Sequence, residues 1–435
     1  MTLMFLKLPL RPVFLFILVL VSFFAAPRDS SGASADEARI IMQLQREIAP
    51  ETGESVFYLK NGDKVRGVRL EEDAEHIKVK QFFGYSGSMV STLKRSDVLR
   101  IEPVSAAEAD ITGEEIKIKK ELPGFHFSRS GIYSFFTDQD YFKVSKSIDL
   151  LQRLNSGFLV TFGPLIDNAL TRRNYVIIFR TPKEYDAYKQ KMAPYLKIAA
   201  GFYDVVNNQL VFYDFFNSQD YTQIDSFVKE ESRKIADLKA ENTRYRDSNY
   251  EIYQNNLTAI RNYEHSLAAY SSRLALQARD VNIRILRHEA SHQLTFDLML
   301  SGKAENFDTW LLEGLAEYCS TPSIGEKNSE YIRVFRDALA AGSAIPLREL
   351  FSYSKDNRFY TIDEVSQGLA YAESWALFYF LMQPQWRERF FGYWEGLKTA
   401  DKVTDLDERI KFAQDTLGVS LDELQRQLYA FISTK

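Results

Sequence analysis

The spacing of apolar side chains changes three times along the 435 residues of the chain. Residues 55–104 alternate apolar and polar positions around tight turns such as Asn61-Gly62, which is typical of short antiparallel strands. Residues 124–214 mix strand-like and helical spacing, whereas residues 219–280 show helical spacing alone. This pattern predicts a small β-barrel, followed by a mixed α and β domain that contains a long helical insertion.

The mixed region contains several predicted strands and helices. Residues 143–163 have the spacing of an amphipathic helix, and residues 174–180, NYVIIFR, form an apolar run typical of a buried strand. A further helix is expected to begin after Thr181, whose side chain can cap it. Residues 209–214 predict another strand, which lies either inside the sheet or at its edge.

Residues 219–280 contain neither proline nor glycine, and their apolar residues recur at steps of four and three. The phase of this repeat breaks at residues 246–249, which predicts two long helices folded back as a hairpin. The second helix is expected to run directly into another helical segment, residues 283–300. Such a hairpin stabilises its domain, covers a cleft as a lid, or joins chains as an oligomerisation arm.

Helical spacing returns in the last third of the chain. Residues 310–318, WLLEGLAEY, predict a helix that is apolar apart from two glutamates, and residues 364–382 predict a helix with an apolar core stripe. Residues 406–428 predict an amphipathic helical end that covers the domain. Cys319 is the only cysteine, so it excludes an intramolecular disulfide and is expected to be a small core residue.

Residues 1–35 have the features of an export signal. Lys7 and Arg11 precede the apolar run PVFLFILVLVSFFAA, and Ala33-Ser34-Ala35 matches the small residues before a cleavage site, with Ala26 as the alternative position. The run is short for a membrane-spanning helix, so we expect cleavage and export to the periplasm or the cell exterior, with an uncleaved membrane anchor as the alternative. The net charge of −5 gives no indication of nucleic-acid binding.

Two of the five histidines stand four residues apart in RHEASHQL, residues 287–294. On a helix, His288 and His292 leave the same face about one turn apart, so both rings can reach one metal ion. Glu289 follows the first histidine, where its carboxylate can accept a proton from water at the metal, and it is the candidate general base. The alternative is an ordinary solvated helix face, but apolar flanks predict burial, and burying two histidines without partners would be costly.

A catalytic zinc site takes three protein ligands, so one ligand must come from outside this helix. Glu313 and Glu317 are four residues apart in WLLEGLAEY, and the segment before them is long enough to turn and return. The spacing predicts one ligand and one residue that orients a ligand, without saying which glutamate is which. We therefore expect one Zn²⁺ per chain.

HEASH followed by WLLEGLAEY resembles the gluzincin branch of zinc metallopeptidases, most closely the bacterial peptidase-MA-like domains. This resemblance implies a thermolysin-like catalytic domain, in which Glu313 is the third zinc ligand and Glu317 orients His288. The gap between the histidine pair and the glutamate is slightly longer than in the aminopeptidase-type members, so their substrate preferences are not carried over.

The resemblance implies two further site features. Gluzincins supply a hydrogen-bond donor for the developing oxyanion from a tyrosine or histidine after the glutamate ligand. No histidine follows His292, so Tyr371 is the candidate and Tyr360 the reserve, with core packing as the alternative role for Tyr371. Residues 209–214 correspond to the edge strand that pairs with an extended substrate in this family.

The sequence thus predicts an α+β protein with a signal peptide at residues 1–35, an SH3-like β-barrel at 55–104, and a gluzincin-like domain at 120–435 that contains the insertion 219–280. The expected activity is zinc-dependent hydrolysis of a peptide or protein substrate. One alternative is a non-catalytic envelope protein with a retained zinc site, in which the barrel or the hairpin binds an envelope partner. Another is hydrolysis of a non-peptide amide by the same groups.

Overall fold

The computed structural model describes residues 35–48, 54–82, 88–103, 111–139, 141–166, 173–193, 200–214, 219–300, 303–400 and 405–435. They fall into two compact units, one between residues 35 and 193 and between 203 and 300, the other almost wholly after residue 303. Helices and two sheets are both present, so the α+β class is confirmed. The predicted signal peptide lies outside the described residues apart from Ala35. In the described part of the chain, no helix is both long and apolar enough to cross a membrane.

Five strands near the start form an antiparallel sheet in the order β4-β3-β2-β1-β5. They are β1 (Glu54–Leu59), β2 (Lys64–Glu72), β3 (His76–Phe82), β4 (Ser88–Lys94) and β5 (Val98–Pro103). Only Arg95–Asp97 joins β4 to β5, although these strands are the two edges. Four Cα steps span at most ~15 Å, whereas the edges of a flat five-stranded sheet would be ~19 Å apart. The sheet must therefore curl.

Among the described residues this first sheet does not close, so the prediction of a closed β-barrel is wrong. β5 pairs over its whole length with β1, from Ser55 opposite Pro103 to Leu59 opposite Val98. After the short turn that follows β4, the chain runs along β1 as β5. No ladder joins β4 to β5 in the described part of the chain. The predicted turn at Asn61-Gly62 is confirmed, with Gly62 at a φ of 89°.

The second sheet has the order β6-β7-β8-β10-β9. Its strands are β6 (His126–Ser130), β7 (Tyr133–Thr137), β8 (Asn174–Phe179), β9 (Gly201–Asp204) and β10 (Gln209–Tyr213). β7, β8 and β10 run parallel, and every residue of β8 is buried, as its apolar run predicted. The prediction that residues 209–214 form the substrate-binding edge is wrong. β10 lies between β8 and β9, and β9, which a four-residue turn joins to β10, is the edge strand.

Four helices accompany the sheets: α1 (Ala35–Ile48), α2 (Gly113–Glu121), α3 (Tyr141–Phe162) and α4 (Pro182–Met192). Thr181 caps α4 as predicted, since its side chain accepts a hydrogen bond from the Glu184 N–H. Glu47 at the end of α1 accepts bonds from Lys119 of α2 at 2.8 Å and from the Phe127 N–H of β6 at 2.6 Å. These bonds fix α1 against α2 and the second sheet.

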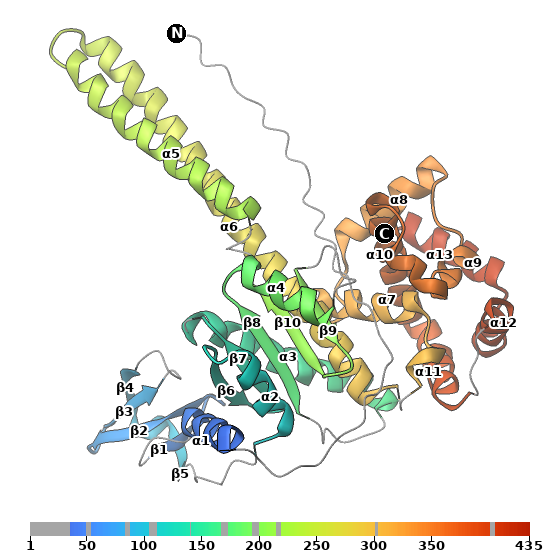
Figure 1. Ribbon diagram of the computed structural model, residues 1–435. Coiled ribbons are helices and arrows are strands. Elements are labelled where there is room, and N and C mark those ends of the chain that lie inside the picture. Colours follow the sequence, from blue (N-terminus) through green and yellow to red (C-terminus); the bar gives the residue numbers. More distant parts are fainter. Residues whose placement is uncertain are drawn as a thin grey trace. The chain divides into compact units, whose positions relative to one another are not determined.

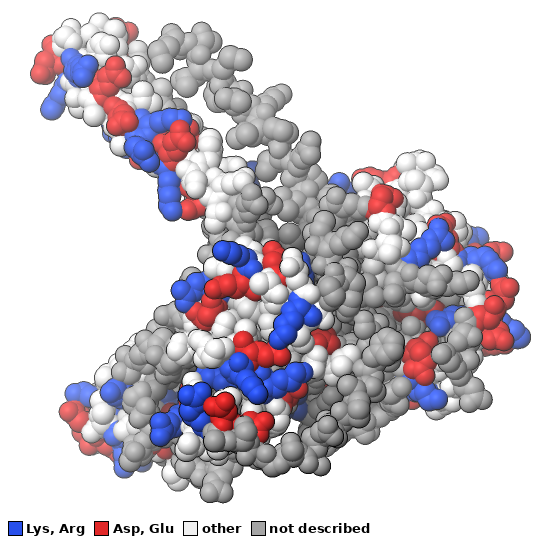
Figure 2. Space-filling model, viewed as in Figure 1, with Lys and Arg blue, Asp and Glu red and all other residues white. Residues whose placement is uncertain are grey.

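The predicted helical hairpin is confirmed. α5 (Gln219–Asn242) and α6 (Tyr250–Leu298) lie side by side, and the break falls at the predicted residues (Figure 1). α6 is continuous over 49 residues, so the second helix of the hairpin and the helix that carries the histidine pair are one element. The hairpin has its own small core of Ile235, Ile260 and Leu267. Figure 2 shows acidic and basic side chains interspersed along it.

The second unit is helical. Its helices are α7 (Thr309–Ser320), α8 (Ser329–Ala341), α9 (Leu347–Ser352), α10 (Glu364–Leu381), α11 (Pro384–Thr399), α12 (Leu406–Leu417) and α13 (Leu421–Ser433). α7 packs closely on α10 at Gly314, where a Cβ atom would lie 2.6 Å from the Ser374 carbonyl oxygen. The predicted helical end at 406–428 consists of two helices, because Gly418 adopts a φ of 67° and ends α12. Cys319 is buried in α7 as expected.

Candidate metal centre

The segment of α6 that carries the histidine pair is buried throughout. Every residue from Ile285 to Thr295 is buried, so the alternative of a solvated helix face is wrong. Its small polar side chains bond to the helix backbone: Ser291 Oγ donates to the Arg287 carbonyl at 2.6 Å, and Thr295 Oγ1 to the Ser291 carbonyl at 2.7 Å. The hydroxyl groups on this segment are therefore satisfied by the helix itself.

The two histidine rings converge on one point. The Nε2 atoms of His288 and His292 are 3.1 Å apart, and the ring planes are inclined at 72°. Two nitrogens that bind a tetrahedral zinc ion at about 2.05 Å are about 3.3 Å apart. The observed separation is close to this value, so one ion fits between the two nitrogens with little movement of either ring.

A carboxylate completes the group. His288, His292 and Glu313 each offer one ligand atom, and these atoms all lie within 4.8 Å of one another. All three side chains are at most 1 % exposed. Two imidazoles and a carboxylate form a donor set that suits divalent transition metals, zinc and iron(II) among them. The predicted ligands therefore come together in a buried group that can hold a metal ion.

Glu313 is held in place by Tyr360, the reserve candidate of the sequence prediction. The Tyr360 hydroxyl donates a hydrogen bond to Glu313 Oε1 at 2.6 Å, a short distance typical of a bond to a charged carboxylate. Tyr360 ends a 3₁₀ helix at Lys355–Tyr360 and is half-buried. Groups that support a ligand in this way fix its orientation and strengthen metal binding.

Glu289, the candidate base, is fully buried and has a tyrosine near it that the sequence did not indicate. Burial raises the pKa of Tyr185 well above its ordinary value, and the nearby charge of Glu289 raises this pKa further. Tyr185 packs in α4 against Phe179 and Tyr213, with 5.0 Å between the ring centroids of the two tyrosines. It therefore keeps its proton and presents a neutral hydroxyl group. No motif in PKEYDAYKQKM marks it.

The other two predicted site residues are also buried. Glu317 lies one turn after Glu313 in α7, and its Oε2 atom accepts a hydrogen bond from Ser320 Oγ at 3.0 Å. Tyr371 in α10 packs edge-on against Phe359, with ring centroids 5.0 Å apart. The roles assigned to them, orienting His288 and stabilising an oxyanion, remain predictions.

Comparison with known proteins places the metal centre inside a family segment. Residues 282–403 match a family described as "Protein of unknown function (DUF1570)". No curated protein and no solved structure matches the chain. The matching segment begins just before the histidine pair and extends past α10, so it contains all the predicted ligands, Glu289 and Tyr360.

Proposed function

We propose that the chain is a zinc-dependent peptidase of gluzincin type with a thermolysin-like catalytic domain. The observation that supports this most is the buried group of His288, His292 and Glu313, in which two ring nitrogens are 3.1 Å apart. Glu289 is buried on the same helical segment, directly after the first histidine. A site that only stabilises the fold has no need of such a carboxylate, and is normally closed by a fourth protein ligand.

The chemistry is divided between the ion and the chain. Zinc, when bound by His288, His292 and Glu313, would polarise the scissile carbonyl group and lower the pKa of water at the site. Glu289 then accepts the proton of the attacking water and returns it to the leaving amine. Its full burial keeps competing water away and strengthens these interactions.

The remaining residues position these groups. Tyr360 holds Glu313 through its 2.6 Å hydrogen bond. Glu317 is proposed to orient His288, and Tyr371 to donate a hydrogen bond to the oxyanion. Substrates are peptides or proteins. From the apolar run and the small residues of 1–35 we also propose export, with a membrane anchor as the alternative.

The test combines metal content with turnover. Wild type, Glu289→Gln and His292→Ala would be purified, reconstituted with Zn²⁺, and assayed on an unstructured protein and on a pool of fluorogenic peptides. Glu251→Gln is the matched control, because Glu251 lies in the same helix but is exposed at its far end. We expect one zinc per chain in all but His292→Ala, and turnover in only the wild type and the control.

Two results would contradict the proposal in different ways. Wild type that binds no zinc after reconstitution would rule out the metal centre. Zinc binding with equal turnover in wild type and Glu289→Gln would rule out Glu289 as the base. Zinc binding with no peptide turnover in any sample would favour the non-catalytic alternative, or a substrate with a non-peptide amide bond.

A further inference from the structure

Asn208 has an unusual backbone conformation for its position. Among the described residues it is the one non-glycine residue with a positive φ, 54°, and its side chain is fully buried in the turn between β9 and β10. This left-handed region costs free energy for residues with a side chain, although asparagine tolerates it better than most. Glycine would fit the turn without that cost, so the asparagine side chain must contribute something that glycine lacks.

The side chain of Asn208 is fixed by its own sheet. Its Oδ1 atom accepts a hydrogen bond from the Tyr203 hydroxyl at 3.0 Å, and its Nδ2 atom lies 3.2 Å from both the Arg173 carbonyl and Asn174 Oδ1. The Asn208 carbonyl also accepts the Tyr175 N–H at 3.3 Å. These contacts hold the amide group at the beginning of β8.

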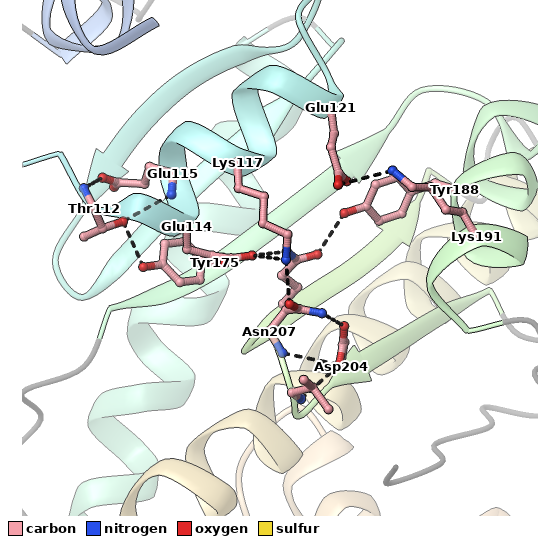
Figure 3. A network of polar contacts seen from close by, with 12 residues as sticks. Thr112, Glu114, Glu115, Lys117, Glu121, Tyr175, Tyr188, Lys191, Asp204 and Asn207 are labelled. Atoms are coloured by element: carbon pink, nitrogen blue, oxygen red, sulfur yellow. Dashed lines mark hydrogen bonds and ion pairs between the residues drawn. The ribbon is translucent and has the colours of Figure 1, made fainter. Parts of the chain in front are cut away.

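The turn that carries Asn208 is also fixed from α2, on the side drawn in Figure 3. Lys117 Nζ donates to Asn207 Oδ1 at 2.7 Å, and Asn207 Nδ2 donates to Asp204 Oδ2 at 2.5 Å (Figure 3). Asp204 Oδ1 in turn accepts the Val206 N–H at 2.9 Å. These hydrogen bonds hold the turn, and with it the backbone of Asn208, in place.

What is bonded to Asn208 is the helix with the histidine pair. Gln293 Nε2 lies 3.0 Å from the Asn208 carbonyl oxygen and 3.1 Å from its Oδ1 atom. One turn later on α6, Asp297 Oδ2 accepts from Asn208 Nδ2 at 3.3 Å. Gln293 directly follows His292 and is fully buried, so these bonds are shielded from water.

From this geometry we infer that Asn208 and Gln293 are positioning residues for the metal centre. The hydrogen bonds of Asn208 to Gln293 and Asp297, here called the interlock, fix the rotation of α6 about its axis and so the direction of the His288 and His292 side chains. The inference rests on the proposed metal site. Side-chain tips lie about 6 Å from a helix axis, so a rotation of about 10° moves them by about 1 Å. Metal–ligand distances tolerate only about 0.2 Å, so a small loss of rotational control weakens binding.

The test uses two variants that weaken the interlock from opposite sides, although Asn208→Gly leaves the bond from Gln293 to the Asn208 backbone carbonyl in place. Asn208→Gly removes the side-chain amide and relieves the backbone, and Gln293→Met removes both donated bonds at similar volume. Asn242→Ala is the matched control. Asn242 is a buried asparagine in the hairpin, and its Nδ2 atom donates at 3.0 Å to the carbonyl of Tyr253, which lies 35 residues before His288 in α6.

Three quantities would be measured on the full chain: zinc affinity by competition with a chelating dye, the visible absorption spectrum after Co²⁺ substitution, and the melting temperature without metal. We expect Gln293→Met to lose about 10- to 100-fold in affinity, Asn208→Gly to lose less because one bond remains, and both to change the Co²⁺ spectrum. The control should lose melting temperature alone. The losses should be less than additive in the double variant, because both changes break the same contact.

The outcomes separate this inference from the proposed function. If wild type binds neither Zn²⁺ nor Co²⁺, the proposed metal site fails and the inference falls with it. If wild type binds both ions and the folded variants match it in affinity and spectrum, the metal site stands and the interlock has no positioning role. Should Gln293→Met not fold, Asn208→Gly still tests the side-chain part of the interlock, the bond from Gln293 to Asn208 Oδ1 and the bond to Asp297.

Discussion

Glu373 is a buried carboxyl group that the proposed chemistry does not use. It lies in α10 with no exposed surface, and its Oε1 atom accepts the Ile345 N–H at 2.8 Å. Its Oε2 atom has no hydrogen-bond partner among the described residues. Burial raises the pKa of Glu373 to about 8 from an ordinary value of 4.5, since an ionised carboxylate is poorly solvated there. The group is therefore protonated in the folded protein at neutral pH.

This raised pKa makes stability depend on pH in a definite direction. A carboxyl group whose pKa is higher in the folded state makes its full contribution to the free energy of unfolding below about pH 4.5. This contribution is lost as the pH rises towards 8. A shift of about 3.5 units corresponds to about 5 kcal/mol in total. Roughly 3 kcal/mol of this would be lost between about pH 5 and pH 8.

We predict that Glu373→Gln removes this loss. The amide keeps an acceptor for the Ile345 N–H and does not ionise. Its NH₂ group lacks an acceptor and costs about 1–3 kcal/mol, but equally at every pH. Relative to wild type, the free energy of unfolding of the variant should therefore rise by about 3 kcal/mol between about pH 5 and pH 8. Urea unfolding at several pH values measures this difference.

Glu349→Gln is the control for the Glu373 experiment. Glu349 is partly exposed, and its charge is a lesser cause of the raised pKa of Glu373. We expect its replacement to leave most of the pH dependence in place. If the difference between wild type and Glu373→Gln stayed constant within about 0.5 kcal/mol over this range, the reasoning from burial would be refuted.

Two further variants test the surroundings of the metal centre. Tyr360→Phe deletes the 2.6 Å hydrogen bond to Glu313 and should lower zinc affinity by about 10- to 100-fold, measured by chelator competition; unchanged affinity would show that the hydroxyl does not support this ligand. Gly314→Ala should lower the free energy of unfolding by about 1–3 kcal/mol, because its Cβ atom would lie 2.6 Å from the backbone of α10. Gly392→Ala is its control, since a Cβ atom there lies no closer than 3.9 Å to its nearest neighbour, and it should be neutral or stabilising in thermal unfolding. Equal losses in both would contradict the packing argument.

Elements with a local signal were predictable. The hairpin, the continuous α6 and α7 follow from apolar spacing over successive turns, because a helix buries one face of its own sequence. The ligands were predictable for the same reason, since His288 and His292 are one helical turn apart wherever that helix lies. The chemistry of these side chains then indicated a group that could hold a metal ion.

Features that depend on distant partners were not predictable. β10 is an interior strand because β8 and β9 both pair with it, and among the described residues no ladder joins β4 to β5, the two edges of the first sheet. The strands have the same alternation in either arrangement, so their sequences do not encode the choice. Predictions for residues 209–214 and 55–104 failed for this reason.

The sequence by itself determined which residues can bind a metal and which segments are helices, because both depend on spacing within one element. Only the tertiary structure decided which other side chains reach them. It placed Tyr360 on Glu313, and brought Asn208 to Gln293 across 85 residues of chain. Hydrogen bonds need atoms within about 3 Å, and such distances between separate elements are set by the packing of the whole fold.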